Sequence, residues 1–188
     1  MIIIASFINC ITKFANSGNI LAVPVIGCSH CSYLGYLHRH GRYFRNLITF
    51  HGCYKIPIQR YKCPSCNKTC SIRPFFILPY FQYSFFVVFS ILLQSFVLKY
   101  SYQLIISNSL ATNPFSCISA SHISFYCKRF RLCCPGIKFF LISSGIFPSE
   151  GSYEASYILE GITDLLWQGH NFPHEYHASF HRFFMQKP

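Results

Sequence analysis

Two C-x2-C pairs constrain the fold of this chain more than any other feature. They are Cys28-Ser-His-Cys31 and Cys63-Pro-Ser-Cys66, and 31 residues separate them. A C-x2-C loop turns two thiolates toward one point, and two such loops supply the tetrahedron that Zn²⁺ prefers. A closed site of four cysteines folds the chain around the ion and leaves no open position for catalysis. The spacing therefore predicts one structural zinc site with Cys28, Cys31, Cys63 and Cys66 as its ligands.

The sequence between the two pairs predicts a β-hairpin. Residues 36–45 and 54–62 favour strands, and His51-Gly52 lies near the expected turn. Pro57 indicates that the second strand lies at an edge of the sheet, because proline cannot donate to a ladder. A hairpin between two cysteine knuckles is the arrangement of a zinc ribbon. Residues 1–7 favour an additional opening strand.

Two features leave an alternative open for the cysteines. The residue after the second cysteine of such a knuckle is often glycine, because the turn can require φ > 0, but Ser32 and Asn67 stand there. The chain has 11 cysteines, so the four could instead be buried or inert thiols. Three residues would substitute for a wrong ligand: Cys53, Cys70 and His30. So many cysteines without an obvious secretory signal predict a reducing compartment, the cytoplasm.

The distribution of charge restricts the chemistry. Residues 1–149 hold 14 Lys/Arg and no Asp/Glu, and all five acidic residues follow. This excludes a paired-carboxylate site and a carboxylate cage for Mg²⁺ or Ca²⁺ in that stretch. A nuclease needs clustered carboxylates to hold two Mg²⁺, so we expect no enzyme activity. The basic stretch favours a polyanionic partner, with nucleic acid first and an anionic membrane surface second.

Three helices are expected after the hairpin. Ser84 is a plausible N-cap for an apolar helix that reaches about Lys99, Ser101 for a short second helix, and Ser119 for a third over residues 120–131. The apolar run at 85–98 is shorter than the ~20 residues of a spanning helix, which favours a buried helix over a membrane anchor.

The third predicted helix is amphipathic. At about 100° per residue, its apolar stripe contains Ile123, Tyr126, Cys127 and Phe130. The other face offers hydroxyls, an aromatic ring and cations that suit phosphates and base edges. The three helices resemble a helix-turn-helix, although the loop before the third exceeds the usual ~3–4 residues. The alternative is a surface helix with solvated cations. The residues predicted to contact DNA are Arg60, Lys62, Ser121, His122, Ser124, Lys128, Arg129 and Arg131.

The C-terminal third is less informative. Residues 132–148 contain Pro135 and Gly136 and are interpreted as a linker with a buried segment. Ser149 or Ser152 is expected to cap a helix that reaches Trp167. His177 and His181 are four residues apart and could share a metal on a helix face, whereas the simpler interpretation is a solvated His-rich tail.

Residues 58–84, IQRYKCPSCNKTCSIRPFFILPYFQYS, resemble an uncharacterised bacterial family of transposase-like proteins. The resemblance extends over about residues 1–131 and includes both C-x2-C pairs and the LPY segment. It implies a zinc ribbon followed by a helix-turn-helix, similar to the DNA-binding N-terminal part of insertion-element transposases. The family's ligand positions correspond to Cys28, Cys31, Cys63 and Cys66. The chain departs at the knuckle glycines and at Cys70, where an aromatic residue or histidine is more usual.

Together these features predict an α+β fold with three parts. They are a zinc-ribbon-like β domain (1–80), a helix-turn-helix-like region (81–131) and a C-terminal helical extension (132–188). The expected function is zinc-dependent binding of double-stranded DNA without a nuclease site, with a separate catalytic transposase subunit as a second candidate partner. The alternatives are a small basic membrane-associated protein and a degraded transposase remnant without activity.

Overall fold

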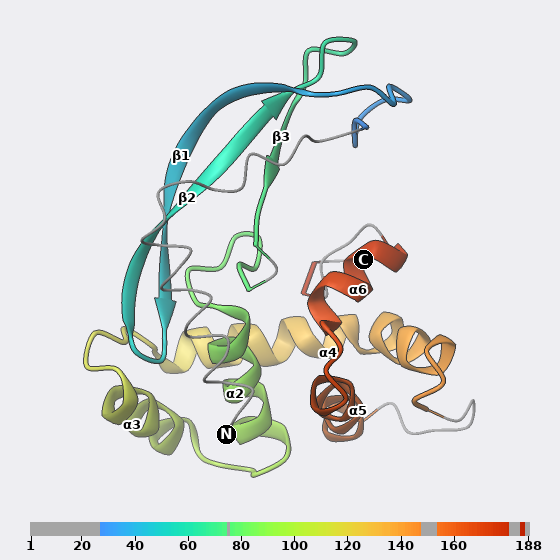
Figure 1. Ribbon diagram of the computed structural model, residues 1–188. Coiled ribbons are helices and arrows are strands. Elements are labelled where there is room, and N and C mark those ends of the chain that lie inside the picture. Colours follow the sequence, from blue (N-terminus) through green and yellow to red (C-terminus); the bar gives the residue numbers. More distant parts are fainter. Residues whose placement is uncertain (1–26, 75, 148–153, 181–184, 187–188) are drawn as a thin grey trace. The chain divides into compact units, whose positions relative to one another are not determined.

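The computed structural model describes residues 27–74, 76–147, 154–180 and 185–186 (Figure 1). These residues form a three-stranded antiparallel sheet followed by five helices, which confirms the α+β class. They fall into two compact units. Residues 27–47 and 53–74 form unit 1, and residues 48–52 with the described residues from 76 onward form unit 2. The strand predicted at 1–7 lies outside the described residues.

The sheet of the described residues has the order β1-β2-β3. β1 (His38–Thr49) and β2 (Gly52–Lys62) form the predicted hairpin. Its turn includes His51, whose N–H donates to Thr49 Oγ1 at 3.2 Å. β3 (Thr69–Ile72) is short and pairs antiparallel with the end of β2, from Gln59↔Ile72 to Lys62↔Thr69. The two segments that carry the cysteine pairs therefore lie before β1 and between β2 and β3.

The prediction that Pro57 marks an edge strand is wrong, because β2 is the central strand. The strand pairing nevertheless explains why β2 tolerates a proline at this position. β3 pairs only with residues 59–62, so at position 57 β2 has a neighbouring strand on one side alone. A missing N–H is tolerated at a position that lacks a second ladder. Locally, Pro57 occupies an edge of the sheet even though its strand is central.

The first three helices begin where the sequence predicts. α2 (Phe85–Phe96), α3 (Tyr102–Thr112) and α4 (Ala120–Ser143) have Ser84, Ser101 and Ser119 as N-caps. Each serine Oγ accepts the backbone N–H three residues later, at 3.3 to 3.4 Å. Such caps satisfy one of the four N–H groups that a helix leaves unpaired.

The predicted end of the third helix at Arg131 is wrong. α4 continues through Pro135 and Gly136 to Ser143. Its buried side chains continue at helical spacing on both sides of the proline, at Phe130, Cys134, Ile137 and Leu141. The apolar stripe outweighs the lost backbone hydrogen bond, because each buried large side chain contributes about 1.5–3 kcal/mol. The interpretation of residues 132–143 as a linker is therefore corrected.

Two further helices complete unit 2. α5 (Ala155–Trp167) reaches the predicted end, but its N-cap is Glu154, and Ser149 and Ser152 lie outside the described residues. α6 (Phe172–Phe180) buries Phe172 and Tyr176 against the core, so this part of the His-rich tail is a packed helix. His181 lies outside the described residues, and the His177–His181 pair is not tested. The largest fully buried side chains of this core include Phe85, Leu92, Ile105, Phe130 and Phe172.

The turn of the hairpin belongs to unit 2 and is bonded to the segment before α2. The N–H of Ile48 donates to the carbonyl of Gln82 at 2.8 Å, and the N–H of Ser84 donates to the carbonyl of Ile48 at 2.9 Å. Ile48 and Tyr83 form a parallel bridge. None of the described helices combines the length and the apolar character of a membrane span, and α2 has only 12 residues.

Candidate metal centre

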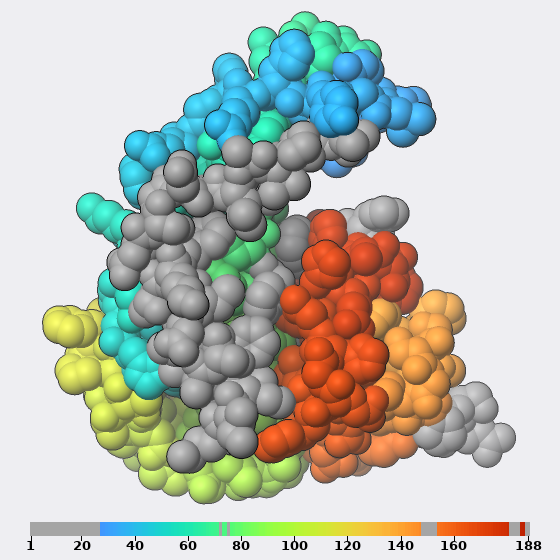
Figure 2. All heavy atoms as spheres, viewed as in Figure 1, coloured from blue at the N-terminus to red at the C-terminus, as the bar shows by residue number. Residues whose placement is uncertain are grey.

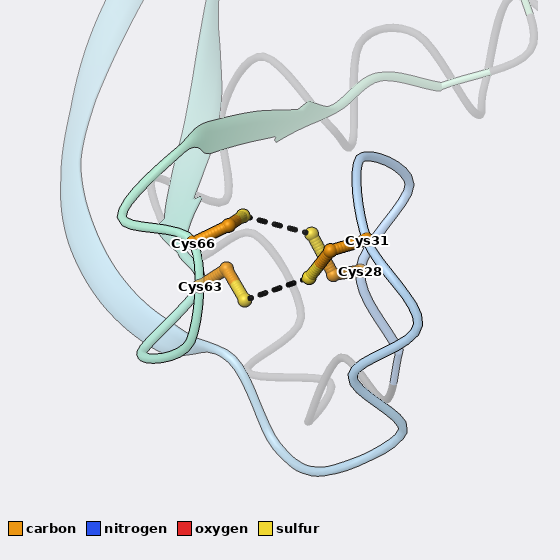
Figure 3. A group of neighbouring side chains, drawn as sticks. All are labelled: Cys28, Cys31, Cys63 and Cys66. Atoms are coloured by element: carbon orange, nitrogen blue, oxygen red, sulfur yellow. Dashed lines mark hydrogen bonds between the residues drawn. The ribbon is translucent and has the colours of Figure 1, made fainter.

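The sulfur atoms of Cys28, Cys31, Cys63 and Cys66 come together in unit 1 and all lie within 4.8 Å of one another. The Sγ atoms of Cys28 and Cys66 are 3.7 Å apart, and those of Cys31 and Cys63 are 3.8 Å apart. Figure 3 shows the two pairs pointing toward each other from separate loops. A tetrahedral ion with Zn–S bonds of about 2.3 Å has sulfurs about 3.8 Å apart. The donor set and its spacing therefore fit a tetrahedral metal such as Zn²⁺.

The loop before β1 forms the first knuckle. Gly27 has φ +84°, which glycine adopts without cost, and this directs the chain into the turn. The N–H of Cys28 donates to the carbonyl of Tyr33 at 2.9 Å and closes the loop. The N–H of His30 donates to Cys28 Sγ at 3.3 Å. A backbone donor of this kind orients and stabilises a thiolate ligand.

The loop between β2 and β3 forms the second knuckle. The N–H of Asn67 donates to the carbonyl of Cys63 at 3.0 Å, and the N–H of Cys63 donates to the carbonyl of Lys68 at 2.9 Å. Asn67 has φ +57°, so the expected left-handed residue is present and asparagine tolerates it. Ser32 is not among the described non-glycine residues with positive φ. The missing glycines are therefore compatible with both knuckles.

A small apolar cluster supports the four sulfurs. Leu37, Tyr61 and Cys63 are buried, and Tyr33 and Cys70 pack against them. Tyr61 pairs with Cys70 across β2 and β3. Leu37 and Tyr61 are not among the site residues that the sequence predicts. The alternation at the end of β2, where Tyr61 is buried between Arg60 and Lys62, was the available signal.

The electrostatics of the cluster favour a cation. The hydrogen bond from the His30 N–H lowers the pKa of Cys28 to about 7. At Cys66 the Lys68 N–H lowers the pKa, but burial and the hydrogen bonds to Cys31, Cys28 and Cys63 raise it to about 11. Four thiolates this close repel one another, so the second proton is harder to remove than the first. A dication would remove this repulsion and let all four thiols ionise.

The three residues considered as substitutes lie outside the group of four. His30 and Cys53 are exposed. Cys70 is half-buried beside the cluster, and burial raises the pKa of its thiol. Among the described residues, the side chains that come close enough to share a metal ion are those of the four predicted cysteines. The predicted cysteine cluster is confirmed.

The two cations predicted to contact DNA from the hairpin lie at the end of β2. Arg60 and Lys62 alternate with Tyr61, so they occupy the face of the sheet opposite to Tyr61 and Cys70. Both side chains are half-buried. The guanidinium of Arg60 donates to Thr69 Oγ1 at 3.3 Å.

The remaining predicted DNA contacts lie on α4, where the predicted apolar stripe is buried. Ser121, His122, Lys128 and Arg131 are exposed, and Ser124 and Arg129 are half-buried. His122 Nδ1 accepts the N–H of Ser119 at 3.2 Å in a capping box. Two arginines lie over aromatic rings: Arg129 over Phe125 at 5.4 Å and Arg131 over Phe96 at 5.0 Å.

Comparison of the chain with models of known protein families, with curated proteins and with solved structures found no match. The site itself is thus what defines the class of this protein: an α+β chain with a cluster of four cysteines, spaced to hold a tetrahedral metal ion, at one end of a three-stranded sheet.

Proposed function

We propose that this chain is a zinc-dependent DNA-binding protein, related to the N-terminal region of insertion-element transposases and without a nuclease site of its own. One observation carries the proposal: four cysteine sulfurs converge at tetrahedral spacing in a unit that has no carboxylate. Residues 27–74 hold eight Lys/Arg and no Asp/Glu. A zinc-stabilised unit with this charge attracts phosphates and does not repel them.

The helices provide the second part of the proposal. In a helix-turn-helix formed by α2, α3 and α4, the N-terminal half of α4 would enter the major groove. Its exposed residues include Ser121, Lys128 and Arg131, which are types that contact phosphates and base edges. The loop from 113 to 119 is longer than the usual turn of about 3–4 residues between the helices of such a motif.

The role of zinc would be structural. When bound, the ion supplies folding energy to the two knuckles and a closed coordination shell. The ten described cysteines are all free, and the proposal requires a reducing compartment such as the cytoplasm.

Metal analysis and DNA titration test the proposal together. Purified protein is expected to contain about one zinc per chain. The Cys63→Ser variant should lose most of the metal, and Cys53→Ser, which changes an exposed cysteine outside the cluster, should retain it. Zinc-loaded protein should bind a duplex with an affinity that falls steeply with salt.

The α4 contacts are tested with Lys128→Gln and Arg131→Gln. Each should reduce the salt dependence of duplex binding by about one unit of slope, because each removes about one phosphate contact. Arg131→Lys, which keeps the positive charge, serves as the control and should leave the slope unchanged. Zinc-loaded protein with no duplex affinity at low salt would refute the DNA-binding proposal and favour a remnant.

A further inference from the structure

The first half of β1 is an exposed stretch of cationic and aromatic residues. All seven residues from His38 to Phe44, with the sequence HRHGRYF, are exposed. β1 is also the first strand of the sheet order, so it lies at an edge of the described sheet (Figure 1). In Figure 2 the blue atoms of this part of the chain are open to view. Because both faces of this part of the strand are exposed, packing in the core does not explain its aromatic and cationic residues.

Side chains alternate between the two faces of a strand, so His38 shares a face with His40, and Arg42 shares a face with Phe44; Gly41, with φ +82°, lies between the two pairs. We name these four residues the β1 row. Phe44 is 60% exposed, which is unfavourable for a phenyl ring unless a partner covers it. The guanidinium of Arg42 lies 5.7 Å from the centre of the Phe44 ring. The row thus combines three aromatic or imidazole rings with a cation that contacts one of them.

The spacing of the row suits stacked bases. Alternate residues of a strand are about 6.8 Å apart, twice the rise of about 3.4 Å per nucleotide in a stacked strand. In a duplex the faces of the bases are already stacked on one another, so exposed rings add little to phosphate contacts. In a single strand those faces are available, and aromatic side chains stack on them with little dependence on sequence.

The charge around the row is suitable for the phosphates of such a strand. Arg39 and Arg42 belong to the same exposed stretch, and unit 1 contains no carboxylate to oppose them. Leu37, the residue immediately before β1, is buried with Tyr61 and Cys63 beside the cysteine cluster. Metal binding would therefore order the start of the strand that carries the row.

We propose that the β1 row binds single-stranded nucleic acid, with bases stacked on Phe44 and the two histidines and with a phosphate held by Arg42. This inference rests on the proposed function, because it assigns a second nucleic-acid surface to the same zinc-dependent protein. It differs from the duplex contacts of α4 in the residues used and in the state of the nucleic acid bound.

Fluorescence anisotropy with the zinc-loaded full chain tests the proposal. The probes are labelled oligothymidine and oligouridine of about 12 nucleotides, with a duplex of the same length as the third ligand. Phe44→Ala should weaken single-strand binding between about 5-fold and about 150-fold and change duplex binding by less than about twofold. Phe44→Trp should retain single-strand binding, and Phe44→Leu should lose it as the alanine variant does, because stacking needs a ring.

Tyr43→Ala is the matched control, since Tyr43 is an exposed ring on the opposite face of the same strand. Its single-strand affinity should stay close to that of the unchanged protein. Binding of either single strand supports the proposal, because stacking does not require the 2′-hydroxyl. Equal losses in Phe44→Ala and Tyr43→Ala, or equal losses for single strand and duplex, would overturn it.

The proposed function and this inference fail in different ways. Duplex binding that depends on Lys128 and Arg131, without single-strand binding, would overturn the inference and leave the proposed function intact. Binding to neither form of nucleic acid would reject both. Unchanged thermal unfolding of the variants would show that the effect is not structural, as expected for exposed side chains.

Discussion

The side-chain amide of Asn113 donates from Nδ2 to the carbonyl of Thr49 at 2.8 Å, although the two residues are 64 positions apart in the sequence. Asn113 is the C-cap of α3, and Thr49 is the last residue of β1, so this bond joins the hairpin turn to the helices within unit 2. Asn113 Oδ1 also accepts the N–H of Phe115 at 2.9 Å. Both partners of this buried amide are backbone groups. Without the Asn113 side chain, both would lose this hydrogen bond.

Asn113→Ala should therefore destabilise unit 2. The change leaves a buried carbonyl without this donor and an N–H without its acceptor, at a cost of about 2 kcal/mol. Chemical denaturation followed by helical circular dichroism measures the loss. Asn46→Ala is the control, because Asn46 is exposed, and it should change the free energy of unfolding by less than about 0.5 kcal/mol. Equal effects of the two substitutions would contradict the prediction.

The starts of the helices could be predicted from the sequence, but the end of α4 could not. Ser84, Ser101 and Ser119 act locally, since a serine Oγ needs only the backbone three residues ahead. The end of α4 depends on what α5 and α6 bury against it, which no local signal records. Pro135 is a strong local signal for a break, and packing overrides it.

The cysteine cluster could be predicted because spacing alone specifies its ligands. Its supporting residues could not be predicted in the same way. The burial of Leu37 depends on Tyr61, which lies in β2, and β3 could not be inferred because four residues carry too little pattern. Similarly, Pro57 marks a position where β2 has a neighbouring strand on one side alone, but it does not show that the whole strand lies at an edge.

Removal of the metal should unfold unit 1 and spare unit 2. In unit 1 the apolar cluster around the cysteines is small, and Leu47, Ile56 and Ile58 are buried farther along the hairpin, whereas the core of unit 2 has many large buried side chains. A chelator added to zinc-loaded protein should therefore increase amide hydrogen exchange at residues 27–47 and 53–74. Exchange in α2, α4 and α5 should remain slow. Chelation that accelerates both units equally, or neither, would be inconsistent with a structural metal in unit 1.

Unit 2 should lose stability in alkaline solution because of its buried thiols. Burial, together with Cys133, raises the pKa of Cys134 from 9.0 to about 12. As pH rises above 9.0, the thiol ionises first in the unfolded chain, so its contribution to stability is complete below that pH and is lost as pH approaches about 12. The free energy of unfolding should fall by about 1.4 kcal/mol per pH unit for this group.

Cys134→Ala provides the comparison for the alkaline effect. The variant lacks the thiol, so its free energy of unfolding should decline less steeply between about pH 9.5 and about pH 11. The difference in slope should be about 1.4 kcal/mol per pH unit, the contribution of one titrating proton. A uniform loss from the smaller side chain would lower the whole curve without changing its slope. Parallel curves for the two proteins would therefore show that Cys134 does not titrate in this range.

Pro135→Ala should stabilise the protein. Pro135 is exposed within α4, where it removes one backbone hydrogen bond, and proline in a helix interior costs about 3 kcal/mol relative to alanine. Because α4 already follows a helical path on both sides of this residue, alanine restores the N–H without changing the fold. A gain of about 1–3 kcal/mol in the free energy of unfolding is expected.

Pro114→Ala is the matched control, since Pro114 is also exposed but lies in the loop before α4. Proline in a loop restricts the unfolded chain, so its loss there should not stabilise the protein. Chemical denaturation of the three proteins measures the difference, and a Pro135→Ala variant no more stable than the parent chain would mean that α4 is interrupted at this residue.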